Sequence, residues 1–349
     1  MLALTVRPGQ AGSLELSEMP EPQPGAGELL VDGVAVGVCG TDREIAGAEY
    51  GWAPAGSDRL ILGHESLGRV RTAPAGSGFA EGDLVVGVVR RPDPKPCGAC
   101  ARGQFDMCRN GEYTERGIKE IHGYASERWT VEAEYAVKLP AELGAAGVLM
   151  EPTSVVAKAW EQVDRIGGRA WYEPRTALVT GAGPIGLLAA LLGTQRGLDV
   201  HVLDIVTDGP KPTAVTALGA TYHSGAMDEV TKRIKPDVII EATGVSSLVI
   251  DAISGTAEYG IVCLTGVSVA GRKISVDIGG ANRSMVLEND VVVGSVNANL
   301  SHFQQAADAL GRADHAWLES LITRRSPLRD YAQAFDSEPN GIKHVIEIS

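Results

Sequence analysis

The feature that most constrains the fold is a glycine-rich turn between two apolar segments near the middle of the chain. TALVT is typical of a buried strand, GAGPIG follows it directly, and the apolar run LLAALL continues as a helix. In this G-x-G-x-x-G pattern, Gly181 permits a tight turn, Gly183 lets a pyrophosphate approach the backbone, and Gly186 lets helix and strand pack closely. The pattern predicts a dinucleotide-binding unit; the alternative is a merely tight turn in another α/β protein.

A carboxylate after the next strand strengthens this prediction. Asp204 ends the apolar segment VHVLD, 18 positions after Gly186, where it would accept hydrogen bonds from the adenosine ribose. We expect a preference for NAD over NADP, because a 2′-phosphate would meet this carboxylate and the next three residues offer no guanidinium group. Lys211 is the alternative that would admit NADP, if its loop folds back towards the phosphate.

The texture of the chain changes at about Ser154. Before it, short β-like runs such as LLVDGVAVGVC alternate with turn residues, which is typical of an antiparallel, barrel-like domain. After it, apolar strands such as PDVIIEATG alternate with helix-like stretches, which is typical of a parallel sheet. We predict an α/β protein with a doubly wound Rossmann domain at 154–300 and a β-rich domain formed by 1–153 and 301–349.

Length and charge exclude several classes of function. The 349 residues suit two domains better than one core. A net charge of -13 disfavours binding to nucleic acid or to anionic membranes. No apolar run reaches the roughly 18 residues of a membrane span, and the N-terminus lacks a signal peptide pattern. We expect a cytoplasmic protein with a small-molecule substrate.

Two groups of residues carry metal-binding chemistry. Cys97, Cys100 and Cys108 cluster as metal ligands do in a reducing compartment. The second group offers sulfur, nitrogen and oxygen donors that zinc accepts: Cys39, His64, Glu65 and Glu151. Each of these alone is more often a buried structural residue. Beside a dinucleotide turn the set gains weight, because hydride transfer needs a Lewis acid or a proton donor at the reacting oxygen.

Several segments carry a family resemblance: GVCGTDREI, ILGHESLGRV, GEYTERGI, MEPTSVVAKA, TGAGPIGLLAAL and GSVNANLSHF. From about Leu29 to its end, the chain resembles the medium-chain, zinc-dependent alcohol dehydrogenase superfamily, and within it most of all the archaeal-type glucose 1-dehydrogenases. The resemblance implies a GroES-like catalytic domain and a Rossmann cofactor domain. It also implies hydride transfer from C1 of an aldopyranose such as glucose to NAD or NADP, giving a lactone. A homodimer or homotetramer, joined through edge strands of the cofactor domains, is expected by the same analogy.

The resemblance assigns roles around a catalytic zinc. Cys39, His64 and Glu151 would hold or approach the ion, with Glu65 exchanging into its ligand shell. Asp42 would hydrogen-bond the His64 ring and so orient it. Thr41 would take the proton from the reacting hydroxyl, the alternative being a residue that merely fills the strand.

Substrate and cofactor groups follow from the same resemblance. The implied sugar-binding residues are Glu115, Glu151, Asn297 and Asn299. The implied cofactor-binding residues are Gly181, Gly183, Pro184, Ile185, Gly186, Asp204, Thr243, Val267 and Asn297. In some relatives an aspartate that holds the sugar occupies the position of Val155, so the identity of the sugar stays open. Glu115 has a plain alternative as a solvated loop charge.

The cysteine cluster departs from the superfamily's structural zinc lobe, which has the pattern C-x2-C-x2-C-x7-C. Its first cysteine position falls on Pro94 here. We expect a structural zinc held by Asp93, Cys97, Cys100 and Cys108, with another carboxylate of the loop as an alternative fourth ligand and a metal-free or weakly binding lobe as the other outcome.

Two rival functions remain at this point. One is a cyclitol, polyol or secondary-metabolite sugar dehydrogenase that uses the same residues. The other is a non-catalytic dinucleotide-binding protein, which the fold also supports. An open zinc site argues against the second, because a binding protein has no use for one.

Overall fold

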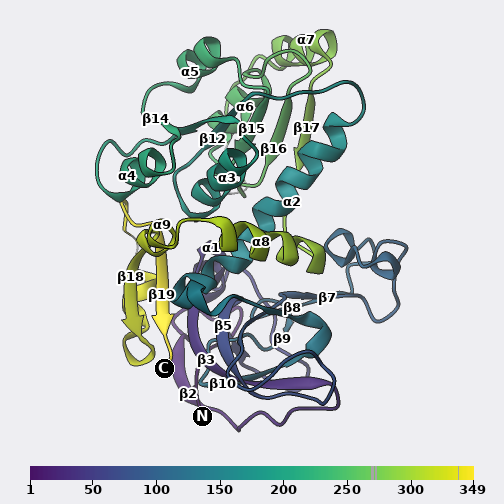
Figure 1. The fold of residues 1–349 in the computed structure, drawn as a ribbon, viewed down its shortest axis with the longest axis vertical. Helices are drawn as coiled ribbons and strands as arrows, with labels where there is room; N and C mark the ends of the chain where they lie inside the picture. Colours follow the sequence, from purple (N-terminus) through teal and green to yellow (C-terminus); the bar gives the residue numbers. More distant parts are fainter. Residues whose placement is uncertain (269–270, 272, 337) are drawn as a thin grey trace. The chain divides into compact units, whose positions relative to one another are not determined.

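The computed structural model describes residues 1–268, 271, 273–336 and 338–349 (Figure 1). It divides into two compact units: the first comprises 1–154, 297–338 and 343–349, and the second comprises 155–296 and 339–342. These units differ from the ranges expected from sequence at residue 154, at 297–300 and at 339–342. Segment 297–300 belongs to the first unit because Asn297 and Asn299 hydrogen-bond residues of that unit.

The first unit is rich in strands. Its strands are β1 (Leu2–Val6), β2 (Glu15–Glu18), β3 (Glu28–Val38), β4 (Leu60–Ile61), β5 (Glu65–Thr72), β6 (Leu84–Gly87), β7 (Arg90–Arg91), β8 (Thr114–Arg116), β9 (Glu120–Ile121), β10 (Arg128–Glu132), β11 (Ala136–Lys138), β18 (Ile322–Pro327) and β19 (Lys343–Glu347). Its α-helices are α1 (Gly40–Ala46), α8 (Leu300–Arg312), α9 (His315–Ser320) and α10 (Ala332–Phe335). Its 3-10 helices are η1 (Cys100–Arg102), η2 (Phe105–Met107), η3 (Ala133–Tyr135), η4 (Ala141–Leu149) and η5 (Leu328–Asp330).

Strand β3 is the centre of the largest sheet in this unit. The described strands of that sheet run in the order β11-β6-β5-β3-β19-β18, and β10 also pairs with β3. Burial alternates along β3 as far as Val34, which is typical of a strand with one covered face, and the last four residues, 35–38, are all buried. The sheet is mainly antiparallel, as expected from sequence, but β18 and β19 pair in parallel. The last strand of the chain therefore lies beside β3, and its residue His344 pairs with Val38 at the end of β3.

The second unit is a parallel sheet covered by helices. Its elements are β12 (Thr176–Thr180), α3 (Pro184–Gln195), β13 (Asp199–Leu203), α4 (Pro210–Ala217), β14 (Thr221–His223), α5 (Met227–Ile234), β15 (Val238–Glu241), α6 (Ser246–Ile253), β16 (Ile261–Leu264), α7 (Ile278–Glu288) and β17 (Val291–Gly294). Helix α2 (Met150–Gly167) begins in the first unit and continues into the second. Among the described residues the strand order is β14-β13-β12-β15-β16-β17, with every pairing parallel.

The predicted fold class, a β-rich domain with a doubly wound Rossmann domain, is confirmed. The strand order explains where a ligand would bind in the second unit. The chain runs outwards from β12 to β14 and then returns to β15 on the other side of β12, so the carboxyl end of β12 is a topological switch point. The glycine turn leaves from this end. Within the described residues, none of the helices has the length and apolar character needed to cross a membrane.

Candidate active site

Cys39 lies at the junction of β3 and α1. It is the N-cap of α1: its backbone N–H donates to Asp42 Oδ2 (2.9 Å), and its sulfur accepts from the backbone N–H of Thr41 (3.3 Å). Asp42 is buried, and the pair forms a reciprocal cap. The cap fixes the position of the sulfur at the start of the helix.

His64 brings a ring nitrogen to that sulfur. It follows Gly63, whose φ of +88 lets the chain turn into β5. His64 Nε2 lies 3.0 Å from Cys39 Sγ, and His64 Nδ1 lies 3.4 Å from Asp42 Oδ1. Burial alone would lower the pKa of His64, but the facing Cys39 sulfur and Asp42 carboxylate raise this pKa well above its ordinary value. Cys39 and Asp42 therefore stabilise positive charge at the His64 ring.

Glu65 completes a compact donor set. Single donor atoms of Cys39, His64 and Glu65 all lie within 4.8 Å of one another. Thiolate, imidazole and carboxylate are the donors that zinc binds in proteins. Negative groups surround the His64 ring and raise its pKa, so they stabilise positive charge there. A divalent cation bound by the donor set would supply that charge in place of a proton.

Lys343, which the sequence analysis missed, is the ionic partner of Glu65. Its Nζ lies 2.6 Å from each Glu65 carboxylate oxygen and donates to the backbone oxygen of Val38 (3.3 Å). Both charged side chains are almost completely buried. Burial would lower the pKa of Lys343, yet the facing Glu65 carboxylate raises it, so the lysine is charged at neutral pH. Lys343 holds Glu65 at the edge of the donor set.

Glu151 lies in the first turn of α2, near the same cluster but outside the compact set of three. The pKa of Glu151 is raised to about 7: burial is the largest cause, the charge of His64 lowers the pKa, and the charge of Glu65 raises it. The structure therefore brings Cys39, His64 and Glu65 together in the first unit, and Glu151 feels the charges of His64 and Glu65 from outside this set.

Glu115 is buried rather than solvated, which excludes its plain alternative as a loop charge. Its Oε1 accepts from Arg90 Nε (3.0 Å) and Nη2 (2.9 Å), and from the side-chain amide of Asn297. Asn297 adopts a left-handed backbone conformation (φ 64), which asparagine tolerates better than most residues. Asn299 caps α8 and donates to Asp106 Oδ1 (2.8 Å). Both predicted amides thus belong to one polar network with Glu115.

In the second unit, the three glycines of the turn have the properties that the pattern predicts. Gly181 has a φ of +89, and a Cβ at Gly186 would lie 1.8 Å from the Gly181 carbonyl oxygen. A Cβ at Gly183 would meet nothing within 4 Å, so its backbone is open to a close-approaching group. Gly183 caps α3, whose first residues are Pro184 and Ile185. A pyrophosphate fits such a helix start.

Asp204 follows β13 directly and is held by the backbone. Its Oδ2 accepts from Ala182 N (2.6 Å) in the glycine turn, and its Oδ1 accepts from Val206 N (3.0 Å). Lys211, in the first turn of α4, places its Nζ 3.6 Å from Asp204 Oδ2. The loop therefore brings Lys211 close to Asp204, which is the position that the alternative of NADP binding needs.

Thr243 owes its position to Glu241, which the sequence analysis also missed. The fully buried Glu241 carboxylate accepts from the Thr243 backbone N–H (2.8 Å), the Thr243 hydroxyl and the Thr180 hydroxyl (3.1 Å). Val267 is 78% exposed, so its side chain is accessible to a ligand. Thr243 and Val267 both follow carboxyl ends of parallel strands, where the cofactor of a Rossmann domain binds.

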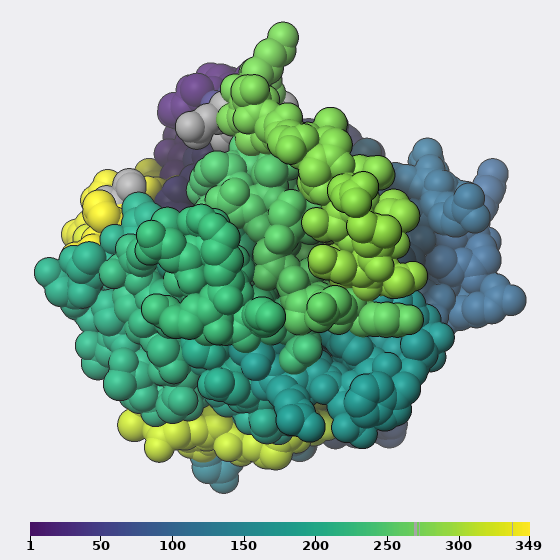
Figure 2. Space-filling model, turned by 90° about the horizontal axis from the view of Figure 1, so that it is seen from above, coloured from purple at the N-terminus to yellow at the C-terminus, as the bar shows by residue number. Residues whose placement is uncertain are grey.

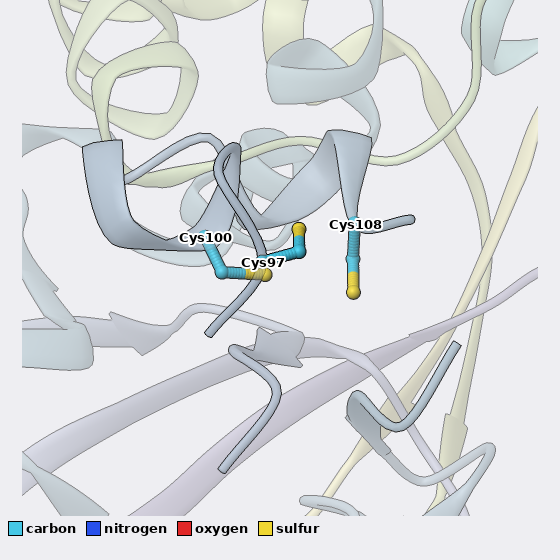
Figure 3. A group of neighbouring side chains, drawn as sticks. All are labelled: Cys97, Cys100 and Cys108. Carbon is cyan, nitrogen blue, oxygen red and sulfur yellow. The ribbon is translucent and has the colours of Figure 1, made fainter. Parts of the chain in front are cut away.

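Cys97, Cys100 and Cys108 form the second cluster, which we call the cysteine lobe together with η1 and η2 (residues 97–108). Their sulfur atoms lie within 4.8 Å of one another, and Figure 3 shows the three side chains gathered in one small region. Asp93 is not part of that compact set. It is buried, however; its Oδ1 accepts from Lys95 N (2.7 Å), while its Oδ2 has no hydrogen-bond partner among the described residues. A buried carboxylate oxygen of this kind can serve as a metal ligand.

Comparisons with known proteins point in one direction. Residues 144–348 match the protein family described as "Glucose dehydrogenase C-terminus", and residues 25–141 match "Alcohol dehydrogenase GroES-like domain". The glucose 1-dehydrogenase of Methanocella arvoryzae is 41% identical over 357 residues, covering 100% of this chain and 99% of the relative. That of Thermoproteus tenax is 41% identical over 358 residues with the same coverage. Among solved structures, the Haloferax mediterranei glucose dehydrogenase in complex with NADP, Zn and gluconolactone has a TM-score of 0.91 and 35% identity, and the match covers 100% of this chain and 99% of that one.

Proposed function

Because the chain belongs to the glucose dehydrogenase family of zinc-dependent, medium-chain dehydrogenases, we propose that it transfers a hydride from a sugar hydroxyl to NAD or NADP. The observation that carries this proposal is the convergence of Cys39, His64 and Glu65 within 4.8 Å. A dinucleotide-binding protein without catalytic activity would not need this buried donor set.

The first unit supplies the groups that act on the reacting hydroxyl. Cys39, His64 and Glu151, with Glu65 as an exchanging neighbour, would hold zinc. When bound, zinc supplies a Lewis acid that lowers the pKa of the hydroxyl, and the nicotinamide ring supplies the hydride acceptor. Asp42 keeps Nδ1 of His64 turned towards itself, so that Nε2 faces the sulfur of Cys39.

Proton transfer is the proposed role of Thr41. Thr41 lies in the first turn of α1, two residues after Cys39 in the sequence. In the overall reaction the anomeric hydroxyl loses a proton and C1 loses a hydride, which leaves a lactone. Thr41 would pass that proton on, away from the reacting oxygen.

Sugar recognition is the proposed role of the buried polar groups around Glu115. Glu115, Asn297 and Asn299 can bind several hydroxyls at fixed positions, and they would lose partners when an analogue lacking a hydroxyl binds. Val155 offers no hydrogen bond at the position where some relatives bind sugar through an aspartate. We therefore propose an aldopyranose such as glucose, with a cyclitol, polyol or secondary-metabolite sugar as the alternative substrate.

The cysteine lobe is the proposed site of a structural zinc. Three cysteine sulfurs support this proposal, and Asp93 is the proposed fourth ligand because of its buried, unpartnered oxygen. The cysteines of this chain are unpaired, which suits a reducing, cytoplasmic location.

We also propose that the chain forms a homo-oligomer through β17. This strand is one edge of the parallel sheet, and its residues Val291, Val292 and Val293 are only partly buried. Exposed apolar residues on α7 precede it in the chain: Ile278, Val286 and Leu287. An apolar edge strand pairs readily with another strand, and a second copy of the same chain offers a matching one. Figure 2 shows the light green segment that includes α7 at the surface in that view.

The test of the proposed function is the formation of reduced cofactor from a panel of aldoses, cyclitols and polyols, with NAD and with NADP. We expect oxidation of an aldopyranose with the lactone as product. Oxidation of cyclitols or polyols alone would favour the alternative substrates, and no oxidation of any of these compounds by zinc-loaded protein would contradict the proposal.

A further inference from the structure

Asp106, in η2 of the cysteine lobe, contacts groups from two other parts of the first unit. Its side-chain Oδ1 accepts from Asn299 Nδ2 (2.8 Å) at the start of α8. Its backbone oxygen accepts from Arg90 Nη1 (3.1 Å) on β7. All three side chains are buried. One residue of the lobe therefore fixes both an amide and a guanidinium group.

Arg90 extends this network to the proposed sugar-binding carboxylate. The same guanidinium group that donates to Asp106 also donates through Nε and Nη2 to Glu115 Oε1. The plane of the group also lies over the ring of Tyr113, 3.7 Å from its centroid. A planar guanidinium with partners on several sides has a defined orientation. Glu115 in turn accepts from the amide of Asn297.

The network has a simple geometrical consequence. Glu115, Asn297 and Asn299 come from two segments that are 182 residues apart in the chain, yet all three connect to Asp106 directly or through Arg90. Each of these links involves a side chain or backbone group of a charged residue in a buried setting, where a hydrogen bond is strong and a missing partner is costly. A shift of η2 would therefore displace all three proposed sugar-binding groups together.

We propose that Asp106 is a positioning residue for sugar binding, and that the cysteine lobe is the support on which the sugar-binding groups are aligned. This inference rests on the proposed sugar dehydrogenase function. It places the effect of the lobe on sugar affinity rather than on hydride transfer, because Asp106 bonds Asn299 and Arg90. In the donor set, by contrast, Cys39 contacts His64, and Glu65 contacts Lys343.

The test compares substitutions in the full-length, zinc-loaded enzyme. Asp106→Ala removes the acceptor for Asn299, and we expect the KM for the sugar to rise about tenfold, the size of one lost buried hydrogen bond. The kcat at saturating sugar and the Kd for the dinucleotide should stay within about twofold. Asp106→Asn keeps a side-chain oxygen at the same place and should restore most of the sugar affinity. Met107→Ala is the matched control, since this neighbour on η2 is 53% exposed.

A second variant covers the case in which Asp106→Ala does not fold. Arg90→Lys keeps the charge but cannot bridge Asp106 and Glu115 with a planar fork, so the same selective rise in sugar KM is expected. An unchanged sugar KM in folded Asp106→Ala or Arg90→Lys, or a fall in kcat alone, would overturn the positioning role while leaving the proposed function intact. A wild-type enzyme that oxidises no aldose would overturn both.

Discussion

His64 is the residue whose loss separates the two chemistries of the molecule. Its ring contacts Cys39 and Asp42 in the first unit, whereas the glycine turn belongs to the second. We expect His64→Ala to lower turnover by about a thousandfold or more, because a Lewis acid contributes several kcal/mol to charge stabilisation. Dinucleotide affinity, measured by fluorescence titration, should change little. His315→Ala removes an exposed histidine and serves as the control; near-normal turnover of His64→Ala would contradict the zinc assignment.

Glu115 tests the sugar-binding assignment at the level of one charge. Glu115→Gln keeps the size of the side chain but loses a charge-assisted hydrogen bond. The kcat/KM for the sugar should therefore fall by a factor that corresponds to about 1.5 to 3 kcal/mol of transition-state stabilisation. Glu112→Gln, which changes an exposed carboxylate just before β8, should leave kcat/KM unchanged. Equal kcat/KM values for the two variants would show that Glu115 does not bind sugar.

We expect Asp204 and Lys211 together to decide which cofactor is preferred. We expect NAD to be favoured, because the backbone of the glycine turn fixes the Asp204 carboxylate. Lys211 Nζ, 3.6 Å from Asp204 Oδ2, should reduce the preference for NAD over NADP. In Asp204→Ala the lysine would face a 2′-phosphate without competition, so the ratio of kcat/KM for NADP to that for NAD should rise about tenfold. Lys211→Ala should lower this ratio. Asp208→Ala is a control for loss of loop charge, and an unchanged ratio in Asp204→Ala would refute the assignment.

At the scale of elements, local patterns predict more than distant pairings do. The β12–α3–β13 unit was visible because strand, glycine turn and helix are contiguous. Lys343 was not visible as the partner of Glu65, because 278 residues separate them and a lysine in a terminal strand normally faces solvent. Arg90 was missed because arginine is normally exposed, whereas here it is buried and paired with Glu115. Sequence motifs thus identify the side chains that carry donor atoms, such as Glu65. The charged partners that orient them, such as Lys343, lie on strands that only the fold brings close.

The cysteine lobe is an element whose metal content can be counted directly. If Asp93 completes the site, zinc analysis of the wild-type protein should give about two ions per chain, falling towards one in Cys100→Ser/Cys108→Ser. Cys263→Ser, which removes a buried cysteine of β16, should keep both ions. Fully active wild-type protein with a single zinc would mean that the substitution of the first cysteine position by Pro94 has left the lobe without metal.

For the whole molecule, the parallel sheet has two edges of different character. Strand β17 at one edge is VVVG with partly buried valines, and β14 at the other is TYH with an exposed first residue. A second chain placed at β17 would bury apolar side chains, whereas at β14 it would bury the polar side chains of Thr221 and His223. The apolar edge is therefore the one at which a second copy should join.

The mass in solution tests this assignment. Light scattering of the wild type should give about two or four times the chain mass of 36.5 kDa. Val293→Lys on β17 should yield a monomer that still binds dinucleotide, because the substitution lies at the sheet edge and the glycine turn is unchanged. Thr221→Lys on β14 carries the same new charge at the opposite edge and should leave the assembly intact. If Thr221→Lys dissociates the oligomer and Val293→Lys does not, the interface lies at β14 and the exposed valines of β17 need another explanation.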